Sequence, residues 1–248
     1  PAAAATNAGP DGRNAEGVRL ELSGGRNDRS WEAALRYGEG FDDGAGDGPR
    51  LRLDGAGRPL IRSDVQSEGL DIIEIATGAF ETPFAGGRLR LNGRLSRDLY
   101  DYDEINRTTF PGGGREISHD GDDKDETEIG GRFSRSFGAR TTLELIALQQ
   151  TKDRAFASTL RSDGGAFDFA LDSKTGERIG RVVATYRAND ALSFETGGEG
   201  AFNWLRGRTR FAQDGVPIVL PAANVRVEET RGEVFAKTVW RPSAKWTV

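Results

Sequence analysis

The chain has 248 residues, a formal charge of −5 and an isoelectric point near 5.2, and it contains one histidine, no cysteine and no methionine. The lack of cysteine excludes disulfide frameworks, cysteine-ligated zinc, iron–sulfur clusters and thiol nucleophiles. The acidic balance argues against a general nucleic-acid binder, so nucleic acid is not an expected partner.

The hydropathy of the chain and its two ends indicate which targeting and membrane segments it contains. No run of ~18 apolar residues occurs, which excludes a transmembrane helix, and the opening stretch lacks the pattern of a signal peptide. Residues 1–15 are small and polar, and we expect a loop or a disordered end there. The chain begins at Pro1 without a start methionine and stops on the strand-like ending 245–248. We therefore expect a processed protein or, in keeping with that ending, an internal piece of a longer one.

From residue 16 to residue 248 the dominant pattern is alternation of apolar and polar residues with a period of two, which is typical of strands with two unlike faces. The alternation is ambiguous at 70–83, where Ile72 and Ile73 fall on opposite faces. It is clear at 88–99, where Leu89, Leu91, Gly93 and Leu95 share one face and Arg88, Arg90, Asn92, Arg94, Ser96 and Asp98 share the other. The predicted strands are 16–24, 29–39, 68–83, 88–101, 125–137, 141–156, 176–188, 191–206, 223–240 and from 244 onward.

The range 191–206 carries the most extended two-faced stripe. Its apolar side holds Leu192, Phe194, Phe202 and Trp204, and its polar side holds Glu195 and Glu199. We predict that the apolar side of this strand meets lipid.

Short and long connections alternate along the chain. Short turns are predicted at 25–28, 84–87, 137–140, 188–190 and 241–245. Longer connections rich in Asp, Gly, Arg and Pro are predicted at 40–67, 102–124, 157–175 and 207–222. In outer-membrane barrels the periplasmic turns are short and the extracellular loops are long, so we expect all four long connections to lie outside the cell.

These features together predict an all-β fold, an antiparallel up-and-down transmembrane β-barrel of which about ten strands are seen. The predicted strands are longer than those of typical soluble sheets, and they suffice to cross hydrocarbon at a tilt of ~45°. Aromatic residues near strand ends, such as Phe84, Phe137, Tyr186, Trp240 and Trp246, fit a membrane-interface girdle. The alternative is a soluble antiparallel sandwich, which would also alternate.

The segment VRVEETRGEVFAKTVWRPSAKWTV at 225–248 resembles the barrel of TonB-dependent outer-membrane receptors. The hairpin GGRLRLNGRLSRDLYDYDE at 86–104 is similar to barrel hairpins of the same family. The resemblance implies a 22-stranded barrel closed by an N-terminal plug, energised through TonB. It implies a cell outer-membrane location in a Gram-negative bacterium, with outer-membrane lipid, the TonB system and a small-molecule ligand as partners. Neither a plug nor a TonB-contacting segment is recognised in the chain, which is why we expect an interior part of a receptor.

Candidate ligand contacts cluster in and after the strand 88–101. They are Asp98, Tyr100, Tyr102, Asp103, Arg88, Arg90 and Arg94. Arginines that point into a lumen can guide an anionic solute or anchor a plug's carboxylates. The alternative for the run Arg88, Arg90, Arg94 and Arg97 is a ladder of ion pairs with acids on neighbouring strands, such as Glu144, Glu195 and Glu199. The aromatic residues Tyr100, Tyr102, Phe110, Phe167 and Phe169 are expected in loops, where they stack on a ligand or pack among themselves.

Other polar motifs favour structural roles. The acidic stretch 120–128 offers carboxylates to Ca²⁺ but fails the EF-hand spacing, so a solvated loop is expected. His119 lies between Ser118 and Asp120, and three consecutive residues cannot face one another as a triad. We expect no catalytic residues, no metal and no cofactor, and hence no enzyme.

The expected function is energised uptake of a scarce solute such as an iron chelate, cobalamin or a sugar. The alternatives are a passive porin-like channel and, with less support, an outer-membrane barrel enzyme.

Overall fold

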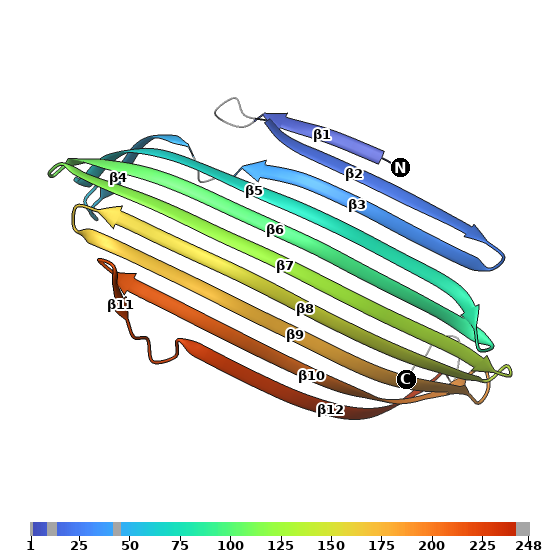
Figure 1. The fold of residues 1–248 in the computed structure, drawn as a ribbon. Coiled ribbons are helices and arrows are strands. Elements are labelled where there is room, and N and C mark those ends of the chain that lie inside the picture. The colour runs from blue at the N-terminus through green and yellow to red at the C-terminus, as the bar shows by residue number, and fades with distance from the viewer. Residues whose placement is uncertain (1, 9–13, 42–45, 242–248) are drawn as a thin grey trace.

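The structure is a computed structural model that describes residues 2–8, 14–41 and 46–241, and these residues form one sheet of 12 antiparallel strands. Figure 1 shows the strands side by side in a single layer. Their bounds are β1 Ala2–Ala8, β2 Asn14–Arg26, β3 Arg29–Phe41, β4 Asp47–Leu53, β5 Pro59–Phe84, β6 Gly87–Phe110, β7 Gly114–Phe137, β8 Thr141–Ser162, β9 Gly165–Arg187, β10 Leu192–Gln213, β11 Val216–Ile218 and β12 Asn224–Trp240. In the described ranges no helix is long and apolar enough to cross a membrane.

The topology is up-and-down. The order is β1-β2-β3-β5-β6-β7-β8-β9-β10, with β4 paired to β5 and with β11 and β12 both paired to β10. Among the described residues, β1 and β12 lie at opposite edges of the sheet and do not pair with each other, so the sheet is open (Figure 1). The structure thus shows the expected all-β antiparallel architecture as an open sheet.

The short turns lie at one end of the sheet, as predicted. The turn between β2 and β3 consists of Asn27 and Asp28, whose φ angles of 52° and 60° are both positive. Two positive φ angles are characteristic of the tight type I′ hairpin, whose twist matches that of the strands. Ala85 and Gly86 form the same kind of two-residue turn between β5 and β6. The turn predicted at 241–245 and the strand predicted from 244 lie almost wholly outside the described residues.

The opposite end of the sheet differs from the expectation, because most of the predicted long connections are strand. The ranges 102–124 and 157–175 fall mainly within β6 to β9, and only 111–113 and 163–164 leave the strands there. The ranges 40–67 and 207–222 contain β4 and β11. The strands β5 to β10 therefore have 22 to 26 residues. Residues 1–15 likewise contain β1 and the start of β2, where a loop was expected.

The registers assign each side chain to one of two faces, since directly opposite residues of an antiparallel pair lie on the same face. We call one of these the banded face, because it carries a band of mainly apolar residues. Representatives, one from each of seven strands, are Leu35, Leu95, Ile129, Leu145, Val182, Phe194 and Val234. The other, the polar face, carries residues such as Arg90, Arg132 and Glu144.

The apolar band is exposed. The seven representatives are between 41% and 89% accessible, and the buried hydrophobic residues of the described chain are limited to Ala15, Val65 and Ala201. A sheet normally buries its apolar face against a second layer. Here the described residues provide no such layer.

Aromatic side chains mark the edge of the band near the short turns. Phe84 and Phe133 meet edge to face at a centroid distance of 6.1 Å, and Phe137, Tyr186 and Trp240 lie on the same banded face. The aromatic residues expected near the strand ends therefore lie together on one face, apart from Trp246, which lies outside the described residues. At the other edge of the band, Trp204 lies at the same level as Leu95.

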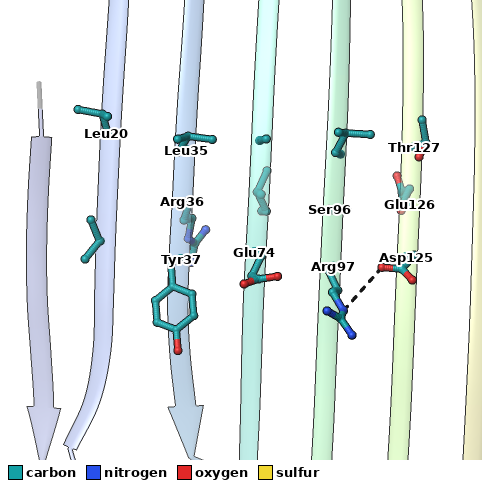
Figure 2. A pocket seen from close by; sticks show the side chains of 14 residues that line it. Leu20, Leu35, Arg36, Tyr37, Glu74, Ser96, Arg97, Asp125, Glu126 and Thr127 are labelled. Atoms are coloured by element: carbon teal, nitrogen blue, oxygen red, sulfur yellow. Dashed lines mark ion pairs between the residues drawn. The ribbon is translucent and has the colours of Figure 1, made fainter.

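One step beyond Trp204, the banded face changes from apolar to charged across the sheet. We call these residues the charged row; in strand order they are Glu74, Arg97, Asp125, Asp153, Lys174, Arg206 and Arg226. Figure 2 shows this boundary, with Leu35 and Thr127 at one level and Glu74, Arg97 and Asp125 at the next.

The height of the band matches a bilayer. Along β10 it extends from Leu192 to Trp204, which is 13 residues. At ~3.3 Å per residue this is about 40 Å along the strand, and a tilt of ~45° reduces it to about 28 Å across a membrane. The hydrocarbon core of a bilayer is ~30 Å thick.

Candidate ligand-binding face

The polar face is the sheltered side of the sheet. On β9, for example, Ser173 and Thr175 of the polar face are half-buried, whereas Asp172 and Lys174 of the banded face are exposed. This difference indicates that the sheet curves toward the polar face, which makes that face the wall of any enclosed space. Six of the seven predicted ligand contacts lie on it: Arg88, Arg90, Arg94, Asp98, Tyr100 and Tyr102.

Asp103 is the exception, because it lies on the banded face opposite His119. Arg97 also faces that side, where its Nε atom is 3.9 Å from a carboxylate oxygen of Asp125. Neither residue can therefore act together with Tyr100 on one ligand.

The two arginines of β6 nearest the short turn, Arg88 and Arg90, are paired with acids, as the alternative of an ion-pair ladder predicted. Arg88 donates to Glu81 at 2.6 Å, and Arg90 donates to Glu32. The partners differ from those expected, because Glu81 lies on β5 next to β6, and Glu32 lies on β3 within reach of Arg90 across β5. Glu144 and Glu199 lie farther along the sheet and pair there with Arg132, and with Arg181 and Arg231, respectively.

Beyond the charged row, the polar face of β6 carries a tyrosine pair held by an ion pair. The rings of Tyr100 and Tyr102 are stacked at 6.4 Å, and the Tyr102 hydroxyl donates to Glu104 at 2.8 Å. Arg50 on β4 reaches across β5 and donates to both oxygens of Glu104, at 2.6 and 2.7 Å. These hydrogen bonds from Arg50 hold the pKa of the Glu104 carboxyl below its usual value, and burial raises the pKa of Tyr102.

A second charged group lies beside the tyrosines on β6 to β8. Arg154 donates to both oxygens of Asp122, at 2.7 and 2.9 Å, and Lys124 is 3.1 Å from Asp122 and 3.8 Å from Asp98. Burial opposes ionisation of Asp122, but the hydrogen bonds from Arg154 and Lys124 outweigh it and lower the pKa of that carboxyl. Lys124 thus ties the predicted contact Asp98 to a fixed carboxylate–guanidinium pair.

An aromatic cluster completes the outer part of the polar face on β8, β9 and β10. Phe156 meets Phe169 at 5.9 Å, Phe167 stacks on Phe211 at 6.2 Å, and the Arg154 guanidinium lies 5.5 Å over the Phe156 ring. Phe167 and Phe169 were expected in a loop and are instead strand residues on one face. Phe156 and Phe211 were not identified from the sequence, although the period-two spacing of Phe167 and Phe169 was a usable signal.

The acidic stretch 120–128 does not gather around one point. Asp120, Asp122, Glu126 and Glu128 lie on the polar face, whereas Asp123 and Asp125 lie on the banded face. A strand that sends successive side chains to opposite sides cannot direct this run at a single cation. The stretch is also strand rather than the solvated loop that was expected.

The only histidine lies on the banded face between two carboxylates. Its Nδ1 atom is 3.1 Å from Asp103, and its Nε2 atom is 3.8 Å from Asp101. Their ligand atoms lie within 4.8 Å of one another, which is close enough for a metal ion, but all three side chains are well exposed. Ser118 and Asp120 lie on the other face, so no triad forms around His119.

A hollow on the banded face spans β2 to β7 at the edge of the apolar band. Its volume is about 620 Å³, and its floor lies at Ala76 between Leu35 and Leu95. Figure 2 shows the charged row along one side of it. A surface that is apolar on one side and charged on the other suits the boundary between hydrocarbon and headgroups rather than a soluble ligand.

No protein-family model matches the chain, and no curated protein matches it in sequence. Among solved structures, the chain is similar to the ferric yersiniabactin uptake receptor FyuA from Yersinia pestis, with 10% sequence identity and a TM-score of 0.43. The match covers 99% of this chain and 44% of the receptor chain, so the chain spans less than half of that receptor's length.

Proposed function

We propose that the chain forms part of the wall of a closed β-barrel in a Gram-negative outer membrane. The observation that carries this proposal is the exposed apolar band, bordered by aromatic residues on one side and by the charged row on the other. In a bilayer every backbone polar group must be bonded within the protein, so a spanning sheet has to close. The edges at β1 and β12 would then pair with each other or with further strands of a larger barrel of the 22-stranded kind.

We further propose that this barrel is a receptor and transporter for a scarce solute and not an enzyme. Support comes from the resemblance of the segments 86–104 and 225–248 to TonB-dependent receptors, and from the polar face, where carboxylates, guanidinium groups and stacked aromatic rings lie together. Such a surface suits an amphipathic small molecule. On this proposal, an iron chelate, cobalamin or a sugar is the solute, and the TonB system acts through a plug.

The membrane placement is tested by comparing the whole chain in water with the whole chain refolded in the presence of phosphatidylcholine vesicles. We expect the chain to aggregate in water, because of its apolar band and unpaired strand edges, and to float with phosphatidylcholine vesicles after refolding from denaturant. A monodisperse water-soluble monomer that melts cooperatively would contradict the placement and favour the soluble sandwich.

The transport role needs a separate test in cells that make the parent protein. Uptake of the solute that depends on this protein should stop when TonB is deleted. Uptake that continues without TonB would instead favour a passive porin-like channel. A double change of Tyr100 and Tyr102 to alanine should weaken uptake, while the matched change of Thr141 and Thr142 at the short-turn end should leave it unaffected.

A further inference from the structure

Arginines occupy three successive banded-face positions of β10 immediately after Trp204: Arg206, Arg208 and Arg210. The first of them belongs to the charged row. Its directly opposite neighbours are Lys174 on β9 and Arg226 on β12. Like charges placed directly opposite each other destabilise a sheet, so this juxtaposition calls for a compensating anion.

Acids within the sheet compensate only some of these cations. Asp172 pairs with Arg210 at 3.0 Å, Asp153 pairs with Lys174 at 2.9 Å, and Glu228 pairs with Arg226 at 2.6 Å. Within the described residues, neither Arg206 nor Arg208 forms an ion pair. The guanidinium of Arg206 lies 5.7 Å over the Trp204 ring instead.

Arg178 on β9 adds a third arginine without an ion pair in the described part of the chain. It lies one step inside the apolar band, opposite Phe202, and its Nε donates to the neutral side chain of Gln149 at 2.6 Å. Between Arg178 and Lys174 is Gly176, where a Cβ atom would come within 2.3 Å of the Trp204 indole. The indole therefore lies across β9 at Gly176, with cationic side chains on both sides of it.

The level of this cluster relative to the proposed membrane indicates which anion compensates its charge. Tryptophan marks the interface between hydrocarbon and headgroups, and the arginines begin one step beyond Trp204. Phosphate groups of lipids lie at that level, and basic residues there attract anionic lipid. The rest of the charged row, from β5 to β8, is mainly acidic, with Glu74, Asp125 and Asp153, so the attraction is confined to β9, β10 and β12. A hollow of about 470 Å³ opens beside Lys174, Arg206 and Arg208, and Asp123, Asp125, Asp153 and Asp172 line it as well.

We infer that this cluster is a docking site for a phosphorylated lipid of the leaflet next to the long-strand end of the sheet. Arg206 and Arg208 hold the phosphate, Lys174, Arg178 and Arg226 surround it, and the acyl chains lie along Phe202 and Trp204. Guanidinium groups suit this task, because they bind phosphate oxygens in a bidentate fashion. The inference rests on the membrane placement proposed above and goes beyond it by naming a lipid class and its site.

The test compares phosphatidylcholine vesicles with vesicles that also contain diphosphoryl lipid A. The whole chain is refolded into both, and the lipid bound after detergent extraction is identified by mass spectrometry. The chain should retain lipid A in preference to phosphatidylcholine. In the double variant R206Q/R208Q this preference should fall roughly fivefold per arginine, the equivalent of ~1 kcal/mol each. The matched control R140Q/R187Q removes the same charge at the short-turn end and should keep the preference.

The possible results separate this inference from the membrane placement. If the unmodified chain fails to insert even into phosphatidylcholine, the proposed function fails. If it inserts but R206Q/R208Q and R140Q/R187Q retain lipid A equally, only the docking site is refuted. If free inorganic phosphate displaces lipid A completely, the site recognises phosphate alone and the assignment to a lipid is wrong.

Discussion

The banded face makes a sharp prediction about two adjacent valines of β9. Val182 lies on the banded face opposite Gly198, and Gly198 is six residues from both Leu192 and Trp204, so Val182 lies at mid-height in the band. Arginine at the bilayer midplane of a barrel costs about 2–4 kcal/mol. We therefore expect V182R to lower the free energy of unfolding from phosphatidylcholine vesicles by that amount.

The neighbouring variant V183R is the matched control. Val183 lies on the polar face directly opposite Glu144, so a new arginine there meets water and a carboxylate, and its cost should stay below about 1 kcal/mol. Gly198 and Gly197, the adjacent pair on β10, are less suitable. A Cβ atom at Gly197 would lie 2.4 Å from the Val182 carbonyl oxygen, so arginine there is not harmless.

The assay is guanidinium unfolding of the vesicle-inserted chain, followed by tryptophan fluorescence. A large loss in V182R with a small loss in V183R agrees with the assignment of faces. Equal losses in the two variants, or a larger loss in V183R, would refute it.

Two further predictions concern topology and acid stability. In cells, G113C should react with a membrane-impermeant thiol reagent on the intact surface, and N189C only after the outer membrane is opened; the reverse pattern would invert the topology. Gly113 is the better probe because it is exposed in the connection between β6 and β7, whereas Asp122 is 8% accessible and bonded to Arg154. Because Arg50 lowers the pKa of Glu104, the stability from this contact is complete above the unfolded-state pKa of glutamate, ~4.3, and is lost as the pH falls through the lower folded-state value. The protection factor of the β4 amides, which corrects exchange for its intrinsic pH dependence, should therefore fall at acid pH in the unmodified chain, and E104Q should show the lower protection already at neutral pH; an E104Q chain that keeps full protection at neutral pH would count against this contact.

The half of the fold that carries the apolar band could be predicted from the sequence because its signal is simple. Leu89, Leu91 and Leu95 alternate with arginines, and the structure places them on the faces that the alternation indicated. Short turns were identified because tight hairpins need residues such as Asn27 and Asp28 that tolerate positive φ.

The outer half of the strands was missed for a physical reason. Beyond the charged row β7 carries polar side chains on both faces, so apolar alternation disappears, and residues such as Asp120 and Asp123 resemble a solvated loop. Backbone hydrogen bonds between neighbouring strands continue there without any hydropathy signal. The aromatic cluster around Phe169 was not predicted either, because contacts across β8, β9 and β10 depend on register, which one sequence does not reveal.

The candidate ligand-binding face was likewise predicted only in part. The sequence placed Arg88, Arg90, Arg94 and Asp98 on the correct common face, but it could not choose their ion-pair partners. That choice depends on the order of the strands in the sheet, because Arg90 reaches across β5 to Glu32 on β3, 58 positions away in the chain.

The central claim is that the banded face meets hydrocarbon and the polar face does not. The chain contains no cysteine, so single cysteines at each position from Thr142 to Ala147 on β8 can carry a nitroxide label. In phosphatidylcholine vesicles, collision with oxygen, which concentrates in hydrocarbon, should be frequent at Leu143, Leu145 and Ala147. It should be infrequent at Thr142, Glu144 and Ile146, where a water-soluble nickel complex should collide instead. A period of two with these phases is the predicted result, and uniform accessibility or the opposite phase would contradict it.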